Sequence, residues 1–322
     1  MALLAGCDTL AYYRQAIGGH LDIMSAARPV DDWLADPATS PELRERLALA
    51  KSIRTFASRS LALPDNRSYT RYAQLDRPFA VWNVFAAPEF SVEPRRECFP
   101  VTGCVAYRGF FSQADARAHA QKLEARGFDV YLGGVPAYST LGWFDDPLLS
   151  TFIRYPDVQL ARLIFHELGH QVAYAGGNTA FNESFAVTVE EEGVKRWLEA
   201  QGRSADLAAF EALEARRAQF AERVEQTRAR LAALYAQDLP AEVKRARKAE
   251  ELSRLRALYP KVIPKEANNA YLVSVALYTE LVPRFKALLR ESGGDLPAFY
   301  AKVKALAKSG GFKTPKPPGP AA

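Results

Sequence analysis

The sequence predicts a predominantly helical α+β fold with a small β region in its N-terminal half. Long stretches rich in Ala, Leu and charged residues have helical periodicity, whereas residues 69–107 contain short β-like runs broken by prolines. The 322 residues are 48% hydrophobic and 25% charged, which is ordinary for a globular protein and excludes wholesale disorder. A chain of this length can bury a substantial core.

The N-terminal part is expected to pass from helix to strand. Residues 8–65 are expected to be mainly helical, because apolar residues recur at helical spacing between Pro41 and Leu61. The apolar run AVWNVF at 80–85 is typical of a strand.

The next helix has recognisable ends. Ser112 and Asp115 form a short-acid variant of the capping box, and Gly127 is placed to end the helix, so we expect it over 112–126. Residues 128–132 then have the composition of another strand.

Two helices are expected to follow one another closely in the middle of the chain. The first has Asp157 as its N-cap and extends to about Tyr174, where two glycines stop it. The second spans about 179–200 and ends before Gly202. A short connection makes the two helices antiparallel neighbours.

The C-terminal part is expected to be helical up to its tail. The charged stretch 205–259 is interrupted at Pro240, which predicts an antiparallel helical-hairpin arm with solvated faces. A further helix is expected over 269–291. We expect one domain over 8–307 and a disordered Lys- and Pro-rich tail over 308–322.

The charge balance and the hydropathy pattern exclude two classes of protein. The net charge is +5, but the 42 basic and 37 acidic side chains are interspersed, so we expect no nucleic-acid partner. No run approaches the roughly 18 apolar residues of a membrane-spanning helix.

The chain begins with a short apolar segment that leads to Cys7. The string LAGC at 4–7 resembles a bacterial lipoprotein box, in which the cysteine is lipidated. Only a few apolar residues and no basic region precede it, so residues 1–7 are expected to be the remnant of a signal whose start was trimmed or lies upstream. The alternative is a cysteine that follows small residues by chance.

The other two cysteines lie six positions apart in the segment CFPVTGC. Pro100 and Gly103 allow this segment to fold back on itself, so Cys98 and Cys104 are expected to form a small-loop disulfide in an exported protein. The alternative is a pair of reduced, half-buried thiols.

The segment HELGH at 166–170 is the most informative motif. His166 and His170 are four residues apart on a helix, so both project from one face and can bind one metal ion. Glu167 lies beside them without being required as a ligand. This is the pattern of zinc peptidases, and it contains two of the four histidines of the chain. Gly169 is expected to permit close packing of a neighbouring helix.

The following helix offers a third ligand. Glu183, in the segment FNESFA at 181–186, would be carried back toward the histidines; the alternative is an acid that complements the helix dipole. Glu190 lies two turns further along the same face and can orient a ligand histidine through a hydrogen bond. The alternative for Glu190 is that it begins an acidic run that faces solvent.

Taken together, these segments resemble a bacterial family of predicted aminopeptidase lipoproteins, and the resemblance covers almost the whole chain apart from the tail. The segments that carry it are LAGC, CFPVTGC, AYSTLGWF at 137–144, HELGH, FNESFA and NNA at 268–270. The resemblance implies a zincin-like metallopeptidase of the gluzincin type. One departure is that only twelve residues separate His170 from Glu183, whereas gluzincins place the glutamate further on.

The resemblance implies one Zn²⁺ per chain, held by His166, His170 and Glu183. A catalytic zinc has three protein ligands and one open position. It lowers the pKa of water toward about 7 and polarises the scissile carbonyl. Glu167 would act as the general base and then deliver the proton to the leaving amine.

Two further roles have several candidates. Tyr278 is the expected donor to the developing oxyanion, and Tyr271, two turns earlier on the same face, competes with it. For either tyrosine the alternative is a core residue with a satisfied hydroxyl. Glu190, Asp145 and Asp146 are candidates for binding the α-ammonium group of a substrate.

The segment that precedes the zinc helix is rich in glycine and aromatic residues. Residues 133–146 are expected either to supply an edge strand and loop that line the substrate cleft, or to form a connection whose aromatic residues pack on the core.

The function predicted from the sequence is that of a zinc-dependent peptidase, an aminopeptidase in the first instance. Lipid at Cys7 would anchor it to a membrane of the bacterial envelope, facing the periplasm, with peptides or proteins as substrates. One alternative is a zinc endopeptidase that acts on an envelope protein. The other is a non-catalytic metal-binding scaffold whose arm (205–259) binds a protein partner, but a structural site has no use for Glu167.

Overall fold

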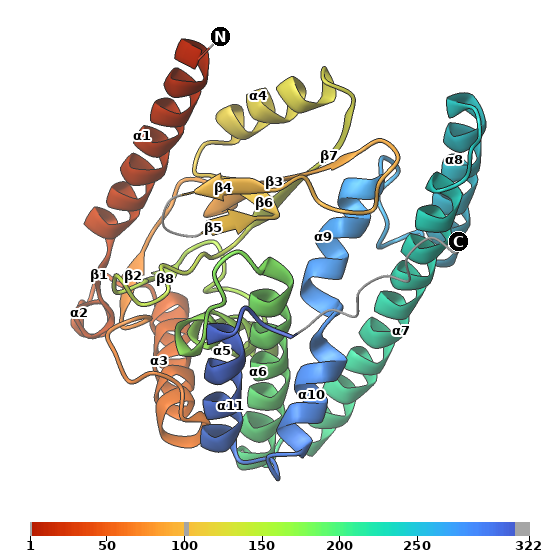
Figure 1. Cartoon of the computed structure of the whole chain (residues 1–322). Helices are drawn as coiled ribbons and strands as arrows, with labels where there is room; N and C mark the ends of the chain where they lie inside the picture. Colours follow the sequence, from red (N-terminus) through yellow and green to blue (C-terminus); the bar gives the residue numbers. More distant parts are fainter. Residues whose placement is uncertain (1, 100–102, 313–322) are drawn as a thin grey trace.

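A computed structural model describes residues 2–99 and 103–312, which form a mostly helical α+β structure (Figure 1). The helices in these residues are α1 (Ala2–Ala26), α2 (Val30–Ala35), α3 (Pro41–Leu61), α4 (Gln113–Glu124), α5 (Asp157–Val172), α6 (Thr179–Ala200), α7 (Ser204–Tyr235), α8 (Ala241–Leu258), α9 (Asn269–Thr279), α10 (Val282–Arg290) and α11 (Leu296–Lys308). The strands are β1 (Arg28–Pro29), β2 (Arg71–Ala73), β3 (Val81–Pro88), β4 (Glu97–Phe99), β5 (Gly103–Val105), β6 (Tyr107–Phe110), β7 (Phe128–Val135) and β8 (Leu148–Leu149).

The antiparallel sheet β6-β3-β7 has a helix on each face (Figure 1). Successive side chains of a strand point to opposite faces. On β3, Trp82, Val84 and Ala86 therefore pack against α4, while Phe85 and Ala87 pack against α9 on the other face. This double burial explains why the run at 80–85 is continuously apolar except at one position.

Two small sheets accompany the main one. Strands β1, β2 and β8 form the first, which joins the end of α1 to the segment before α5. Strands β4 and β5 form the second, where Cys98 and Cys104 are register partners and are joined by the expected disulfide.

Helices α5 and α6 form an antiparallel pair below the main sheet (Figure 1). A Cβ added to Gly169 would lie 3.4 Å from the Cα of Ala186, so the backbones of the two helices approach closely at this position, as the sequence predicts. Both helices are buried among α3, α10 and α11. The pair is therefore held rigidly from several sides.

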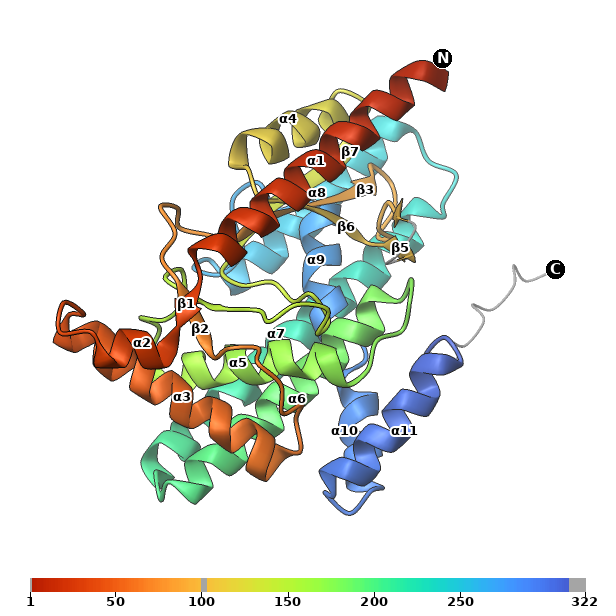
Figure 2. The same cartoon turned by 90° about the vertical axis from the view of Figure 1, so that its left-hand side faces the viewer.

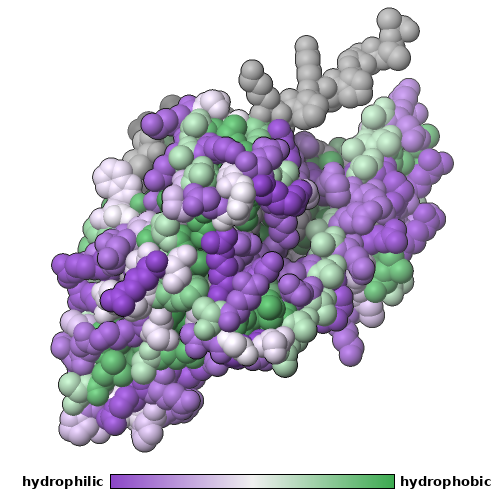
Figure 3. All heavy atoms as spheres, turned by 90° about the horizontal axis from the view of Figure 1, so that it is seen from below, coloured by the Kyte–Doolittle hydropathy of each residue, from purple (hydrophilic) through white to green (hydrophobic). Residues whose placement is uncertain are grey.

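Helices α7 and α8 form the expected hairpin, but the hairpin does not project away from the molecule. Val224 and Leu231 of α7 pack with Leu255 of α8 and with Tyr271 and Leu272 of α9. The outer faces remain hydrophilic, and Figure 3 shows mostly purple spheres on the side where the hairpin lies. The hairpin is thus a docked layer with a solvated outer face.

Two expected helix boundaries are wrong. Asp157 is not the N-cap of α5: Pro156 takes that position, and the Asp157 carboxylate instead accepts hydrogen bonds from Arg46 and Arg203. The helix expected over 269–291 is two helices, α9 and α10. Pro283 has no N–H and its ring excludes the preceding turn, so the chain restarts there as a new helix.

Helix α1 runs along one side of the molecule, in front of the sheet in Figure 2. Its backbone includes residues 2–7, so Cys7 lies within this helix, where the structure describes the backbone alone. The tail expected to be disordered over 308–322 is ordered in its first part: Lys308 ends α11, and Phe312 packs against Phe181 and Phe285, because an aromatic side chain gains by burial in the core. The rest of the tail, from 313 onward, lies outside the described residues. Among the helices that the structure describes, none has the length and apolarity to cross a bilayer.

Candidate metal centre

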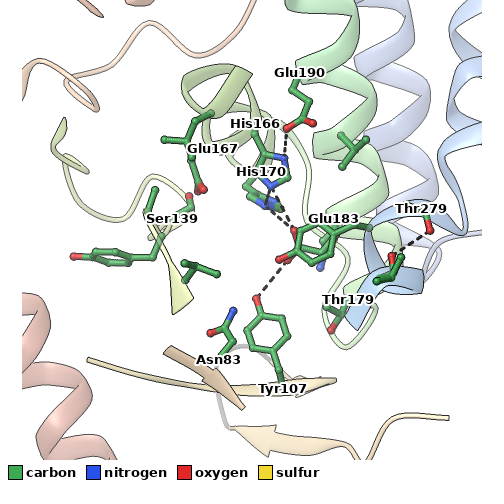
Figure 4. Close-up of a pocket in the computed structure, with 18 of the residues that line it drawn as sticks. Asn83, Tyr107, Ser139, His166, Glu167, His170, Thr179, Glu183, Glu190 and Thr279 are labelled. Carbon is green, nitrogen blue, oxygen red and sulfur yellow. Dashed lines mark hydrogen bonds and ion pairs between the residues drawn. The ribbon is translucent and has the colours of Figure 1, made fainter. Parts of the chain in front are cut away.

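The two helices α5 and α6 bring three ligand atoms together. His166 and His170 point from one face of α5, and Glu183 faces them from the first turns of α6 (Figure 4). The two Nε2 atoms are 3.1 Å apart. The Oε2 atom of Glu183 lies 3.4 Å from Nε2 of His166 and 3.5 Å from Nε2 of His170. The short connection between the helices therefore delivers Glu183 to the histidines.

These separations fit a metal ion. Ligands bound tetrahedrally at about 2.0–2.1 Å lie about 3.3–3.4 Å from one another. The three observed distances, 3.1, 3.4 and 3.5 Å, lie close to that value. Two imidazole nitrogens and one carboxylate oxygen are also a donor set that zinc accepts. His166, His170 and Glu183 can thus hold one metal ion with little rearrangement.

Glu190 fixes the orientation of His166. Its Oε2 lies 2.9 Å from Nδ1 of His166, which keeps a ring N–H on Nδ1 and turns Nε2 toward Glu183 and His170. Arg162 holds Glu190 and also donates to Glu214 of α7 at 2.8 Å. Glu190 is buried and paired, so the solvent-facing alternative for this residue is wrong.

The electrostatics of the metal-free site favour a protonated His166. Burial lowers the pKa of His166, but its hydrogen bonds to Glu183 and Glu190 outweigh burial and raise this pKa to about 10. Burial likewise raises the pKa of Glu183, but the neighbouring His170 and His166 hold it well below its usual range. At neutral pH the positive charge on His166 therefore balances the facing carboxylate of Glu183 in the absence of a cation.

Glu167 differs from the other carboxylates of the site. It is 8% exposed, lines the cavity, and accepts a hydrogen bond from none of the described residues. Burial raises its pKa above the ordinary value. The result is an unpaired carboxylate beside the ligand histidines, which is the state that a general base requires.

The site opens into a cavity of about 1550 Å³ between the main sheet and α5, α6 and α7. Much of its wall is aromatic, with side chains from α1, the strands and α7; these include Tyr12, Tyr13, Phe99, Phe111, Tyr138 and Phe220. A cavity of this size can hold a peptide of several residues.

The structure separates the two candidate tyrosines. Tyr278 lines the cavity, and its ring is stacked beside that of His166 at a centroid distance of 6.3 Å. Tyr271 lies in the core between α9 and the hairpin, where its hydroxyl donates to the carbonyl of Val262. Tyr271 is therefore excluded as a site residue.

The three candidates for binding an α-ammonium group have other partners. Asp145 pairs with Arg67 at 3.2 Å, and Asp146 accepts hydrogen bonds from the backbone and hydroxyl of Thr140. Neither is among the residues that line the cavity. Glu190 lines it but is bound to His166 and Arg162.

Three further glutamates line the cavity and were not expected from the sequence. They are Glu222, Glu225 and Glu280.

The segment 133–146 has features of both expected forms: part of it lines the cavity, and one of its aromatic residues, Tyr138, also packs against the main core. Strand β7 pairs only with β3, so it is an edge of the described sheet. Residues 135–139 and Leu141 line the cavity. Trp143 is 79% exposed and Phe144 is also exposed, so these two aromatic residues do not pack on the core.

One comparison with known proteins gives a family for the chain. The family model described as "Putative aminopeptidase" matches residues 11–313. The chain belongs to this family. The comparisons with curated proteins and with solved structures give no match.

Two cavity residues near the ligands were not predicted from the sequence. The hydroxyl of Tyr107 on β6 lies 3.4 Å from Oε1 of Glu183, on the side of that carboxylate away from the histidines. Asn83 on β3 lies beside it (Figure 4). Neither belongs to a motif, and only the strand register places them near the ligands. The one available signal was that Asn83 is the sole polar residue in the run AVWNVF.

Proposed function

We propose that the protein is a zinc-dependent peptidase with a zincin-like active site, and in the first instance an aminopeptidase. The observation that carries the proposal is the convergence of His166, His170 and Glu183 at tetrahedral spacing beside the unpaired Glu167. Membership of the putative aminopeptidase family supports peptide bonds as the target. The identity of the metal rests on the donor set.

The residues of the chain divide the chemistry among them. When bound, zinc supplies a Lewis acid that polarises a carbonyl oxygen and makes water more acidic. Glu167 takes a proton from the attacking water and passes it to the leaving amine, for which its raised pKa is suited. Glu190 keeps His166 in the tautomer that leaves Nε2 free.

Tyr278 is the donor to the developing oxyanion in this proposal. Burial raises the pKa of its hydroxyl well above the ordinary value, so the hydroxyl keeps its proton at neutral pH. None of the described residues accepts a hydrogen bond from it, whereas the Tyr107 hydroxyl is already directed to Glu183. The free hydroxyl can therefore donate to a substrate.

The size of the cavity favours a second candidate, an endopeptidase acting on an envelope protein. About 1550 Å³ leaves room for chain on both sides of a scissile bond. The same ligands and the same base serve both reactions. The two reactions differ only in whether the site requires a free N-terminus on the substrate.

The proposed location is the bacterial cell envelope, facing the periplasm, with lipid on Cys7 as the membrane anchor. Support comes from the string LAGC and from the disulfide between Cys98 and Cys104, because disulfides persist in oxidising compartments.

The test is hydrolysis of matched peptides by the zinc-loaded protein, with each peptide supplied with a free amine and with an acetylated N-terminus. An aminopeptidase releases single residues from the free peptides alone. Cleavage of both forms at internal bonds would establish the endopeptidase. Cleavage of neither form by protein shown to contain zinc would contradict both candidates.

A further inference from the structure

Asn83 is a polar residue on an otherwise apolar face of the central strand β3. Side chains of alternate residues share a face, so Asn83 points the same way as Val81 and Phe85. Helix α9 covers this face at Phe85 and Ala87. Asn83 lies beyond the cover and lines the cavity, on the opposite side from His166 and Glu167 (Figure 4).

Glycines flank Asn83 on both neighbouring strands. Its register partner is Gly109 on β6 and Gly133 on β7. A Cβ added to Gly109 would lie 3.2 Å from Oδ1 of Asn83, which is tighter than an ordinary contact. On the β6 side no side chain crowds the carboxamide, whereas on the β7 side the Tyr131 ring lies over Gly133, so the carboxamide is unobstructed next to Gly109 and lines the cavity.

The carboxamide of Asn83 lacks a partner in the described part of the chain. The residue is 5% exposed, and none of the described groups donates a hydrogen bond to its side chain or accepts one from it. Neither polar atom of the carboxamide is fully enclosed, so both face the cavity, where they are free to bind a group that enters it. An amide that is held by no other described residue and faces a substrate-sized cavity is suited to bind a ligand there.

We propose that Asn83 binds the backbone of the substrate by pairing with one of its peptide units. This inference rests on the proposed peptidase function and names a substrate-binding residue for it. A carboxamide has an acceptor oxygen and a donor nitrogen side by side, which complement the N–H and C=O of a peptide chain. A neutral amide suits a neutral peptide unit, whereas an α-ammonium group is better matched by a carboxylate.

The experiment measures binding, so that it does not depend on turnover. The probes are a free-amine tetrapeptide of alternating Leu and Phe, chosen for the aromatic cavity, and three analogues in which one peptide bond is replaced by an ester. An ester lacks the N–H donor. Affinities are measured with zinc-loaded Glu167→Gln protein and with the same protein carrying Asn83→Leu or, as a matched control on the same face, Val81→Ala.

One ester is expected to bind about 3- to 10-fold more weakly than the peptide, as for the loss of one hydrogen bond. Asn83→Leu should abolish this difference, and Val81→Ala should retain it. Asn83→Leu should also leave the melting temperature of the ligand-free protein unchanged or higher, because no hydrogen bond to another described residue is lost. A purely structural asparagine would instead lower it.

The outcomes separate this proposal from the function itself. An ester penalty that persists in Asn83→Leu would overturn the role of Asn83, whatever the protein hydrolyses. Binding that depends on Asn83 in a protein without peptidase activity would uphold the residue and refute the function. If the zinc-loaded protein bound none of the peptides, both the role of Asn83 and the proposed peptidase function would be overturned.

Discussion

Two glutamates on adjacent helices show how surroundings divide roles between identical side chains. Burial raises the pKa of Glu167, which has no partner among the described residues. Burial also acts on Glu183, but the facing His170 and His166 hold its pKa well below the usual range. One carboxylate is thus prepared to take up a proton and the other to remain an anion at a cation site.

The role of Glu167 can be isolated by Glu167→Gln. The substitution keeps the shape of the side chain and leaves His166, His170 and Glu183 intact, so zinc content should stay at one per chain. Hydrolysis should fall by about 10²- to 10⁴-fold, because the proton acceptor is lost. The control is Glu222→Gln, which removes the same charge from another wall of the cavity. Undiminished turnover of Glu167→Gln would remove Glu167 as the base.

The proton on His166 predicts how metal binding depends on pH. With its pKa raised to about 10 in the metal-free protein, His166 is protonated at pH 7.5, and a metal ion must displace that proton. Binding should therefore release roughly one proton, and affinity should rise about tenfold per pH unit below the pKa. Calorimetric titration with zinc in buffers of different ionisation enthalpy measures this release. Binding without proton release would contradict the arrangement.

The residues of the site differ in how well the sequence predicts them. His166, Glu167 and His170 lie within one helical turn or so, and helical geometry alone places them together. Tyr271 and Tyr278 are seven residues apart on one face, so periodicity could not separate them. The two tyrosines have different surroundings because the first part of α9, with Tyr271, packs against the hairpin, whereas the last part, with Tyr278, lines the cavity. Asn83 and Tyr107 required the register of non-adjacent strands, which no local pattern contains.

At the scale of elements, the metal centre depends on the crossing of α3, α5 and α6. Gly193 of α6 lies at this crossing. A Cβ there would come within 2.8 Å of the Phe165 ring and 2.9 Å of Leu61, and both side chains are fully buried. Overpacking at such a position cannot be relieved by moving toward solvent.

Replacing Gly193 by Ala should therefore destabilise the protein by about 1 to 2 kcal/mol, because overpacking outweighs the better helix propensity. Gly18 of α1 is the matched control, since a Cβ there meets no atom within 4 Å. Gly18→Ala should be neutral or gain up to about 1 kcal/mol. Urea unfolding of both variants provides the measurement. Equal stabilisation by both changes would show that the crossing is looser than described.

Elements were predicted best where their ends carry local signals. Ser112 caps α4 by accepting a hydrogen bond from the backbone of Asp115, as the capping box indicates. Asn178 caps α6 in the same way. The sequence failed at Asp157, whose carboxylate is drawn away by Arg46 from a distant helix. It also failed at Pro283, where an apolar pattern continued past a residue that ends a helix.

At the scale of the whole molecule, the hairpin of α7 and α8 has a different role from the one expected from the sequence. The sequence predicts a solvated arm, but α7 supplies one wall of the cavity and Glu214, which binds Arg162 behind the metal site. Helix α7 therefore has a charged face toward solvent and another face that lines the cavity. The high content of charged residues predicts the solvated face but not the face that lines the cavity.

Membrane attachment is a property of the whole protein in the cell. Expressed from its natural gene, the protein should take up labelled fatty acid and sediment with membranes, and Cys7→Ser should abolish both. Cys104→Ser is the control, since it removes a cysteine and the disulfide but leaves position 7 intact. Labelling that survives Cys7→Ser would place the anchor at another residue, and a lack of labelling in the unaltered protein would exclude it.

The central claim is that one metal ion, held by His166, His170 and Glu183, makes this chain a peptidase. The most direct measurement is hydrolysis of a free-amine peptide mixture by protein stripped with a chelator and then titrated with zinc. We expect no cleavage by stripped protein and full activity at about one equivalent of zinc, with none restored in His170→Ala. Cleavage that survives stripping, or that zinc restores equally in His170→Ala, would contradict the account.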